Sequence, residues 1–258
     1  MILNKLKKIF YFFSDDTPYY AASLSFFTIF SILPLIALLI VVISSLPAFS
    51  TYLDTLMLYI LDFMNPTKSE ALSTQLTDFL ANTNKLGSIG IFYLLFVFTM
   101  FFKDYEHIVN KIYNVDTRPV YKLFFMYLGF LIIIPLLLIV FVSLSTLSKV
   151  SGFSISQEIF SFLFIWTIFI ILFILSANTK IKFQASAIAS FLTLIALSIT
   201  KSLFGYYVSV NTTYSTIYGS FSVALFFFLW IYISWSIYLY GTKLCSILNQ
   251  KYINQDNN

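Results

Sequence analysis

Six stretches of the chain are almost continuously apolar, and each is long enough to cross a bilayer as a helix. They cover about residues 21–46, 86–102, 123–147, 157–177, 183–208 and 217–240. Around 20 consecutive apolar residues are typical of a transmembrane helix. The pattern therefore predicts an all-α integral membrane protein, in which residues 1–258 form one polytopic domain with six transmembrane helices.

The segments between and around these spans have amphipathic or polar patterns. Residues 47–85 contain two apolar stripes at helical spacing, and Thr67 and Glu70 form a capping box between them. We expect two amphipathic helices that form a cap on the outer side. Residues 1–20 contain lysines interleaved with apolar residues, which predicts a cytoplasmic amphipathic segment at the membrane surface. The polar residues from Gln250 to Asn258 are expected to form a disordered tail.

The first span is the most distinctive segment. It has no charged residue between Ala21 and Leu46, yet Ser25, Thr28 and Ser31 recur every third position. Hydroxylated residues on one side of a membrane helix indicate either close packing against a neighbouring helix or a polar path through the bundle. Pro34 cannot donate a backbone hydrogen bond, which predicts a kink in this helix.

The positions of the charged residues predict how the protein is oriented in the membrane, whereas their balance does not indicate a binding partner. Hydrophobic residues make up 59% of the chain and charged residues 10%, and fifteen Lys and Arg against eleven Asp and Glu give too weak a positive balance to favour nucleic acid. Positive residues concentrate on the cytoplasmic side of membrane proteins. With both termini cytoplasmic, the inner segments carry Lys5, Lys7, Lys8, Lys103, Lys111, Arg118, Lys122, Lys180, Lys182, Lys243 and Lys251, and the outer segments carry Lys68, Lys85 and Lys149.

Lys201 is a charged residue within a predicted span. An ammonium group in hydrocarbon costs roughly 2.5–3.5 kcal/mol on insertion scales, so Lys201 either snorkels to the outer surface or lines a polar cavity. Ser186 and Ser190 lie near the same helix face, and Glu158 is a candidate partner at the outer start of the preceding span. The candidate polar-path residues are Lys201, Ser190, Ser186, Thr28, Ser31, Pro34 and Glu158.

Candidate chemistry elsewhere is sparse. Cys245 is the sole cysteine, which excludes an intrachain disulfide and cysteine-based metal sites. His107 is the sole histidine and is expected to be a solvated residue on a cytoplasmic helix. There is no nucleophile motif and no phosphate-binding loop. We therefore predict no catalytic, cofactor-binding or metal-binding residues.

Four segments together resemble the YihY/BrkB family of bacterial inner-membrane proteins, formerly labelled ribonuclease BN. They are Ala21–Pro34, the segment with Glu106, Asn110, Tyr113 and Val115, the turn from Phe204 to Gly219, and Leu229–Ser234 followed by Gly241. In that family the last helix commonly ends in Gly-Ala-Glu, where this chain has Gly241-Thr242-Lys243. The resemblance implies a multi-pass protein of the bacterial inner membrane and no well-established biochemical activity.

Three function classes fit these observations. The leading hypothesis is a transporter, or a lipid or small-molecule export or flipping protein, with an unknown substrate. An envelope scaffold without transport is the first alternative, and a membrane-bound enzyme is the second, which the missing catalytic cluster disfavours. The expected partners are membrane lipids and the substrate, with homo-oligomers compatible with the sequence and no nucleic acid.

Overall fold

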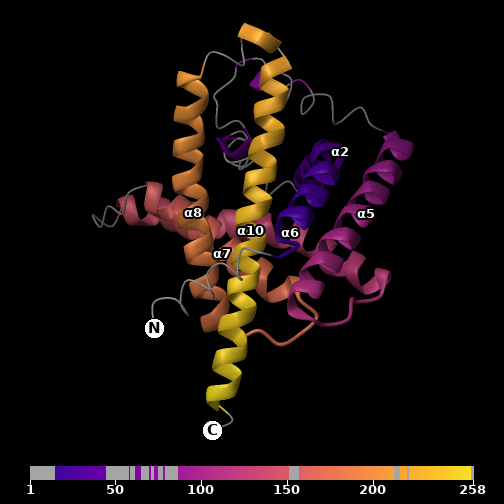
Figure 1. Ribbon diagram of the computed structural model, residues 1–258, viewed down its shortest axis with the longest axis vertical. Coiled ribbons are helices and arrows are strands. Elements are labelled where there is room, and N and C mark those ends of the chain that lie inside the picture. The colour runs from indigo at the N-terminus through magenta and orange to yellow at the C-terminus, as the bar shows by residue number, and fades with distance from the viewer. Residues whose placement is uncertain are drawn as a thin grey trace.

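The computed structural model describes residues 15–44, 58, 62–64, 70, 73–74, 78, 87–150, 157–211, 216–219 and 221–256, and the regular secondary structure in these ranges is α-helical (Figure 1). The long helices are α2 (Thr17–Ser44), α5 (Gly87–Tyr113), α6 (Val120–Val150), α7 (Gln157–Ser176), α8 (Phe183–Val210) and α10 (Phe221–Asp256). Each of them contains most of one predicted span.

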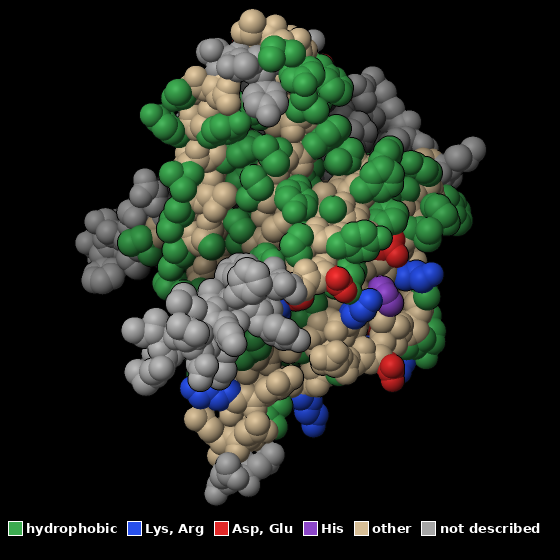
Figure 2. Space-filling view, viewed as in Figure 1, with side chains coloured by type: hydrophobic (Ala, Val, Ile, Leu, Met, Phe, Trp, Pro, Cys, Tyr) green, Lys and Arg blue, Asp and Glu red, His purple; other side chains and the backbone are tan. Residues whose placement is uncertain are grey.

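Four of the described helices are long and apolar enough to cross a membrane. These segments are Val120–Leu144, Ile159–Ser176, Phe183–Val210 and Phe221–Gln255. The prediction of a helical membrane protein is therefore confirmed, whereas the number of six spans stays a prediction. Figure 2 shows that hydrophobic side chains cover the upper part of the visible face and that charged side chains gather in its lower half. This division is the one expected for a bundle that exposes an apolar band to lipid.

The bundle is organised around α10, the longest helix. It packs against α8 along most of the long axis and also against α2 and α5, while α7 packs between α6 and α8 (Figure 1). Gly241 lies in the middle of α10 and is buried. A Cβ atom added there would lie 1.9 Å from the Thr193 hydroxyl of α8, so this crossing requires a glycine.

Contacts between distant segments define one end of the bundle. Lys243 of α10 donates to Asp15, just before α2, at 2.6 Å, and the Lys111 ammonium at the end of α5 lies 5.2 Å from the Tyr20 ring centroid. Burial raises the pKa of the Asp15 carboxyl, but hydrogen bonds from Lys243 and Thr17 outweigh it, so the pKa is lowered overall. The lysine at the position where the family commonly has Glu thus ties the start of α2 to α10.

The opposite end is defined by residues 62–64, which belong to the predicted cap. They contact the C-terminal half of α8 through Lys201 and the N-terminal half of α10 through Trp230, at the end of the bundle opposite the start of α2. The other described cap residues, 58, 70, 73–74 and 78, are helical as well. The rest of the cap and residues 1–14 of the predicted amphipathic segment lie outside the described residues, and which end faces the cytoplasm stays a prediction.

The C-terminal ends of α5 and α10 extend beyond the predicted spans. The helix of the second predicted span is longer than its apolar run, because α5 continues without a break to Tyr113 and is followed by a left-handed Asn114 with φ 54°. The disordered tail is wrong as far as Asp256, since α10 stays helical to that residue. Leu248 and Tyr252 pack against the core, and burial of this face keeps the polar tail helical.

Candidate functional site

A cavity of about 170 Å³ lies inside the bundle. Four helices and the cap contribute to its wall: α2, α7, α8, α10, and Phe63 and Met64 of the cap. Most of the wall is aromatic or aliphatic. Its described lining residues are Thr28, Phe63, Met64, Phe169, Leu172, Leu197, Phe227, Trp230, Ile231, Ser234, Trp235 and Tyr238.

The polar side chains in this wall are already hydrogen-bonded to the protein. The Trp235 indole donates to the Thr28 hydroxyl at 2.8 Å, and Thr28 itself donates to the Leu24 carbonyl at 2.6 Å. The Ser234 hydroxyl donates to the carbonyl of Trp230 at 2.8 Å. A space with so few free polar groups stays dry and accepts apolar molecules, as apolar cavities of about 150 Å³ do in soluble proteins.

Phe63 and Met64 line the cavity on the cap side. The Trp230 indole donates to the Phe63 carbonyl at 2.9 Å, and the two rings meet edge to face with centroids 6.0 Å apart. Beside this contact, the Lys201 ammonium donates to the Asp62 carboxylate at 2.6 Å. The Lys201 side chain is 30% exposed and that of Asp62 73%, so this ion pair is partly solvated and does not line the cavity.

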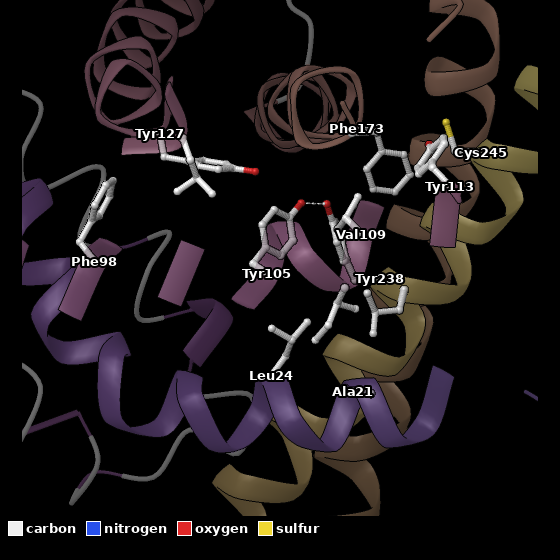
Figure 3. Close-up of a cluster of buried hydrophobic side chains, with 14 of the residues drawn as sticks. Ala21, Leu24, Phe98, Tyr105, Val109, Tyr113, Tyr127, Phe173, Tyr238 and Cys245 are labelled. Atoms are coloured by element: carbon white, nitrogen blue, oxygen red, sulfur yellow. Dashed lines mark hydrogen bonds between the residues drawn. The ribbon is translucent and has the colours of Figure 1, made fainter. Parts of the chain in front are cut away.

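Tyr238 bounds the cavity on the opposite side. Its hydroxyl shares a hydrogen bond with the hydroxyl of Tyr105 from α5, and both side chains are buried (Figure 3). Tyr127 from α6 lies next to this pair, and the Tyr127 hydroxyl is directed toward the two tyrosines. The Tyr127 ring stacks on the Phe102 ring, with centroids 4.1 Å apart. Aromatic side chains from three helices therefore separate the cavity from the next layer of the bundle.

That next layer contains a buried ion pair. Glu106 of α5 has no exposed surface, and its Oε1 accepts from the backbone N–H of Arg118 at 2.9 Å and lies 3.5 Å from the Arg118 guanidinium. The same guanidinium donates to the carbonyls of Ser176 and Ala177 at 3.3 and 2.5 Å. Arg118 thus neutralises the carboxylate and also caps the C-terminal end of α7.

Asn110 extends this polar layer by one turn of α5. It is fully buried, and its side-chain oxygen accepts from the Asn178 backbone N–H at 2.6 Å. Among the described residues, four buried side-chain atoms have no hydrogen-bond partner: Glu106 Oε2, Asn110 Nδ2 and the hydroxyls of Tyr113 and Tyr127. Buried polar atoms are nearly always paired, so these open positions mark the layer as more than structural filling.

The predicted polar-path residues on α2 have different surroundings. Thr28 lines the cavity, whereas Ser31 donates to the Phe27 carbonyl at 2.8 Å within its own helix. Pro34 lies within the continuous helix α2.

Those on α8 face α7 or the cap. Ser186 donates to the Ile170 carbonyl at 2.9 Å, and the Trp166 indole donates to Ser190 at 3.1 Å. Lys201 has Asp62 as its partner, and the side chain of Glu158 lies outside the described residues. The six candidates whose side chains the structure describes therefore do not come together in one place.

The ion pair and the tyrosine pair are functional candidates that sequence reasoning did not select. Glu106, Asn110 and Tyr113 recur at intervals of four and three residues, which places them on one face of a helix. This spacing was the available signal. Its meaning depends on which face of α5 turns inward, and that follows from partners far away in the sequence.

Comparison with known proteins gives a consistent assignment. Residues 11–258 match the family model described as virulence factor BrkB. A UPF0761 membrane protein of Haemophilus influenzae (strain 86-028NP) is 28% identical over 239 residues, which are 89% of each chain. Those of Aggregatibacter aphrophilus and Vibrio parahaemolyticus are 27% and 28% identical over 88% and 90% of this chain and 85% and 77% of their own. No solved structure matches.

Proposed function

This chain belongs to the virulence factor BrkB family of membrane proteins, and we propose that it moves a lipid-like amphipathic molecule across the membrane. The observation that carries the proposal is the apolar cavity inside the bundle, in which the polar groups of the wall are already paired. A packed helical bundle has no structural need for such a space, because unfilled volume costs stability. A cavity that is kept apolar suits the hydrocarbon part of a ligand.

The volume of the cavity and the position of the nearby charged residues indicate which kind of ligand it can hold. A volume of about 170 Å³ holds one apolar segment, such as part of an acyl chain, rather than a whole lipid. Lys201 is paired with Asp62 and does not line the cavity, which favours an apolar segment over an anionic solute in this space. No catalytic step is part of the proposal.

The proposal places the protein in the bacterial inner membrane with both termini in the cytoplasm. Its support is the distribution of Lys and Arg along the chain, together with the contacts that put residues 62–64 at the end opposite Asp15. Reporter fusions after Pro66 and after Asn258 test the orientation. Opposite compartments, with Asn258 inside, are expected, and a shared compartment would refute the six-span arrangement.

A cavity-filling substitution tests the function. We expect Leu197→Trp to abolish transport, because Leu197 of α8 lines the cavity and an indole at that position occupies it. Leu203→Trp is the matched control: it makes the same change on the same helix, at a side chain that is 63% exposed. Both variants are reconstituted in liposomes that contain a trace of phospholipid with a fluorescent label on its acyl chain. Dithionite added outside then reports the fraction of label that changes leaflet.

Wild type and Leu203→Trp should expose label from the inner leaflet at similar rates, and Leu197→Trp should not. Membrane abundance and unfolding temperature show whether each variant is folded. A folded Leu197→Trp protein with the wild-type rate would exclude the cavity as the transport site. A folded wild-type protein without any translocation would instead favour the scaffold hypothesis.

A further inference from the structure

We infer that the buried layer around Glu106, Asn110 and Tyr127 is a binding site for an uncharged hydroxyl-bearing group. The inference rests on the proposed function, since it assigns the polar end of the same amphipathic ligand. Three side-chain atoms carry it: Glu106 Oε2, Asn110 Nδ2 and the Tyr127 hydroxyl, which are buried without a hydrogen-bond partner among the described residues.

The charge of the site favours an uncharged ligand. Arg118 pairs with Glu106 Oε1, so one negative and one positive charge balance. An anion entering the layer would meet the open Oε2 of Glu106, and the guanidinium that would attract it already donates to the carbonyls of Ser176 and Ala177. A phosphate or carboxylate group is therefore disfavoured.

The hydrogen-bonding character of the open atoms selects a hydroxyl. Glu106 Oε2 only accepts, Asn110 Nδ2 only donates, and the Tyr127 hydroxyl does both. The Asn110 amide is oriented by the Asn178 N–H that donates to its oxygen, so its nitrogen remains the open atom. An ammonium group would satisfy Glu106 and leave Asn110 unpaired. A hydroxyl donates to the carboxylate and accepts from the amide, and so it matches the two atoms that have opposite requirements.

The layer lies directly behind the cavity. Tyr238 lines the cavity and is hydrogen-bonded to Tyr105, which precedes Glu106 in α5. Figure 3 shows the Tyr127 hydroxyl directed toward this tyrosine pair, and the charges of Glu106 and Arg118 act on that hydroxyl. The Tyr105–Tyr238 pair therefore lies between the cavity and the polar layer, and a ligand with its apolar chain in the cavity reaches the layer past these two rings.

Tyr127→Phe is the decisive variant, because it removes a hydroxyl that has no hydrogen-bond partner among the described residues. The empty protein should keep its unfolding temperature, since no protein hydrogen bond is lost. Tyr121→Phe is the matched control, with the same change on the same helix at a side chain that is 62% exposed. Binding is measured as the saturable rise in unfolding temperature of the purified full-length protein in phosphatidylcholine nanodiscs, a lipid without hydroxyl groups.

Four probes separate the chemistries: 1-O-octylglycerol, its dimethyl ether, octylammonium and free glycerol. We expect 1-O-octylglycerol to bind most tightly, and its affinity to fall by about 2- to 10-fold in Tyr127→Phe but not in Tyr121→Phe. Equal binding of the dimethyl ether, tighter binding of octylammonium, or an unchanged affinity in Tyr127→Phe would overturn the assignment. Free glycerol that binds as tightly as octylglycerol would identify a soluble polyol as the source of the hydroxyl.

Leu197→Trp distinguishes this inference from the proposed function. Weaker binding of octylglycerol in Leu197→Trp with no effect of Tyr127→Phe would leave the cavity proposal standing and refute the hydroxyl site. The reverse pattern would support the hydroxyl site and refute the cavity as the site of the apolar chain.

Discussion

The crossing of α8 and α10 gives a prediction whose magnitude follows from the structure. In Gly241→Ala the new Cβ would lie 1.9 Å from the Thr193 hydroxyl and 3.0 Å from its Cβ, so rotating the threonine cannot relieve the overlap. Overpacking of this kind costs about 1–3 kcal/mol. Displacing the hydroxyl also breaks its hydrogen bond to the Ala189 carbonyl, 2.7 Å long, which costs about 1 kcal/mol. Alanine gains about 1 kcal/mol over glycine within a helix.

Gly241→Ala should therefore lower the free energy of unfolding by about 1–3 kcal/mol. The measurement is an unfolding titration with sodium dodecyl sulfate in mixed micelles. Gly129→Ala on α6 is the control, because nothing lies within 4 Å of its added Cβ, and it should be neutral or stabilising. Thr193→Ala should restore most of the stability of Gly241→Ala, since it removes the overlapping hydroxyl. A Gly241→Ala protein as stable as wild type would refute the reasoning, and so would a failure of Thr193→Ala to rescue it.

Three further predictions concern the ends of the bundle. Arg118→Met should destabilise the protein by about 3–5 kcal/mol because it leaves Glu106 buried without its counter-ion, and the double variant with Glu106→Gln should recover part of this in the same titration. Asn249→Ala should cost about 1–3 kcal/mol, because this buried amide accepts from one backbone N–H and donates to one carbonyl of the α7–α8 turn; an unchanged unfolding curve would contradict it. Lys201→Met should change stability by less than about 1 kcal/mol, since its ion pair with Asp62 is partly solvated, and membrane abundance should hold; a larger loss would contradict this.

The helices could be predicted from the sequence because the signal for a membrane helix is local. A run of apolar residues fixes the existence and approximate length of α6, α7 and α8 without knowledge of their neighbours. The continuation of α5 beyond the apolar run was predictable for the same reason, since helical periodicity persists to its end. The tail of α10 was not predictable, because a polar segment stays helical there through packing against the rest of the bundle.

The site was harder to predict, because the meaning of a polar residue depends on what surrounds it. Lys201 draws attention as a charge in an apolar run, yet it forms a partly solvated ion pair with Asp62, a cap residue 139 positions away in the sequence. Glu106 lies in a stretch with several charges, which suggests a solvated helix surface, and it is fully buried.

The difference arises from how many helices surround α5 at this level. His107 and Lys111 lie on its exposed face, while Glu106 and Asn110 turn inward toward the ends of α6 and α7. Their partners are Arg118 and Asn178, which lie 12 and 68 residues away in the sequence. Each partner donates a hydrogen bond to one oxygen of the buried side chain and so lowers the cost of its burial. Each side chain keeps its other polar atom unpaired. A bundle that needed only stability would be served as well by apolar side chains at both positions, so the retained open atoms are the strongest argument that this layer binds something.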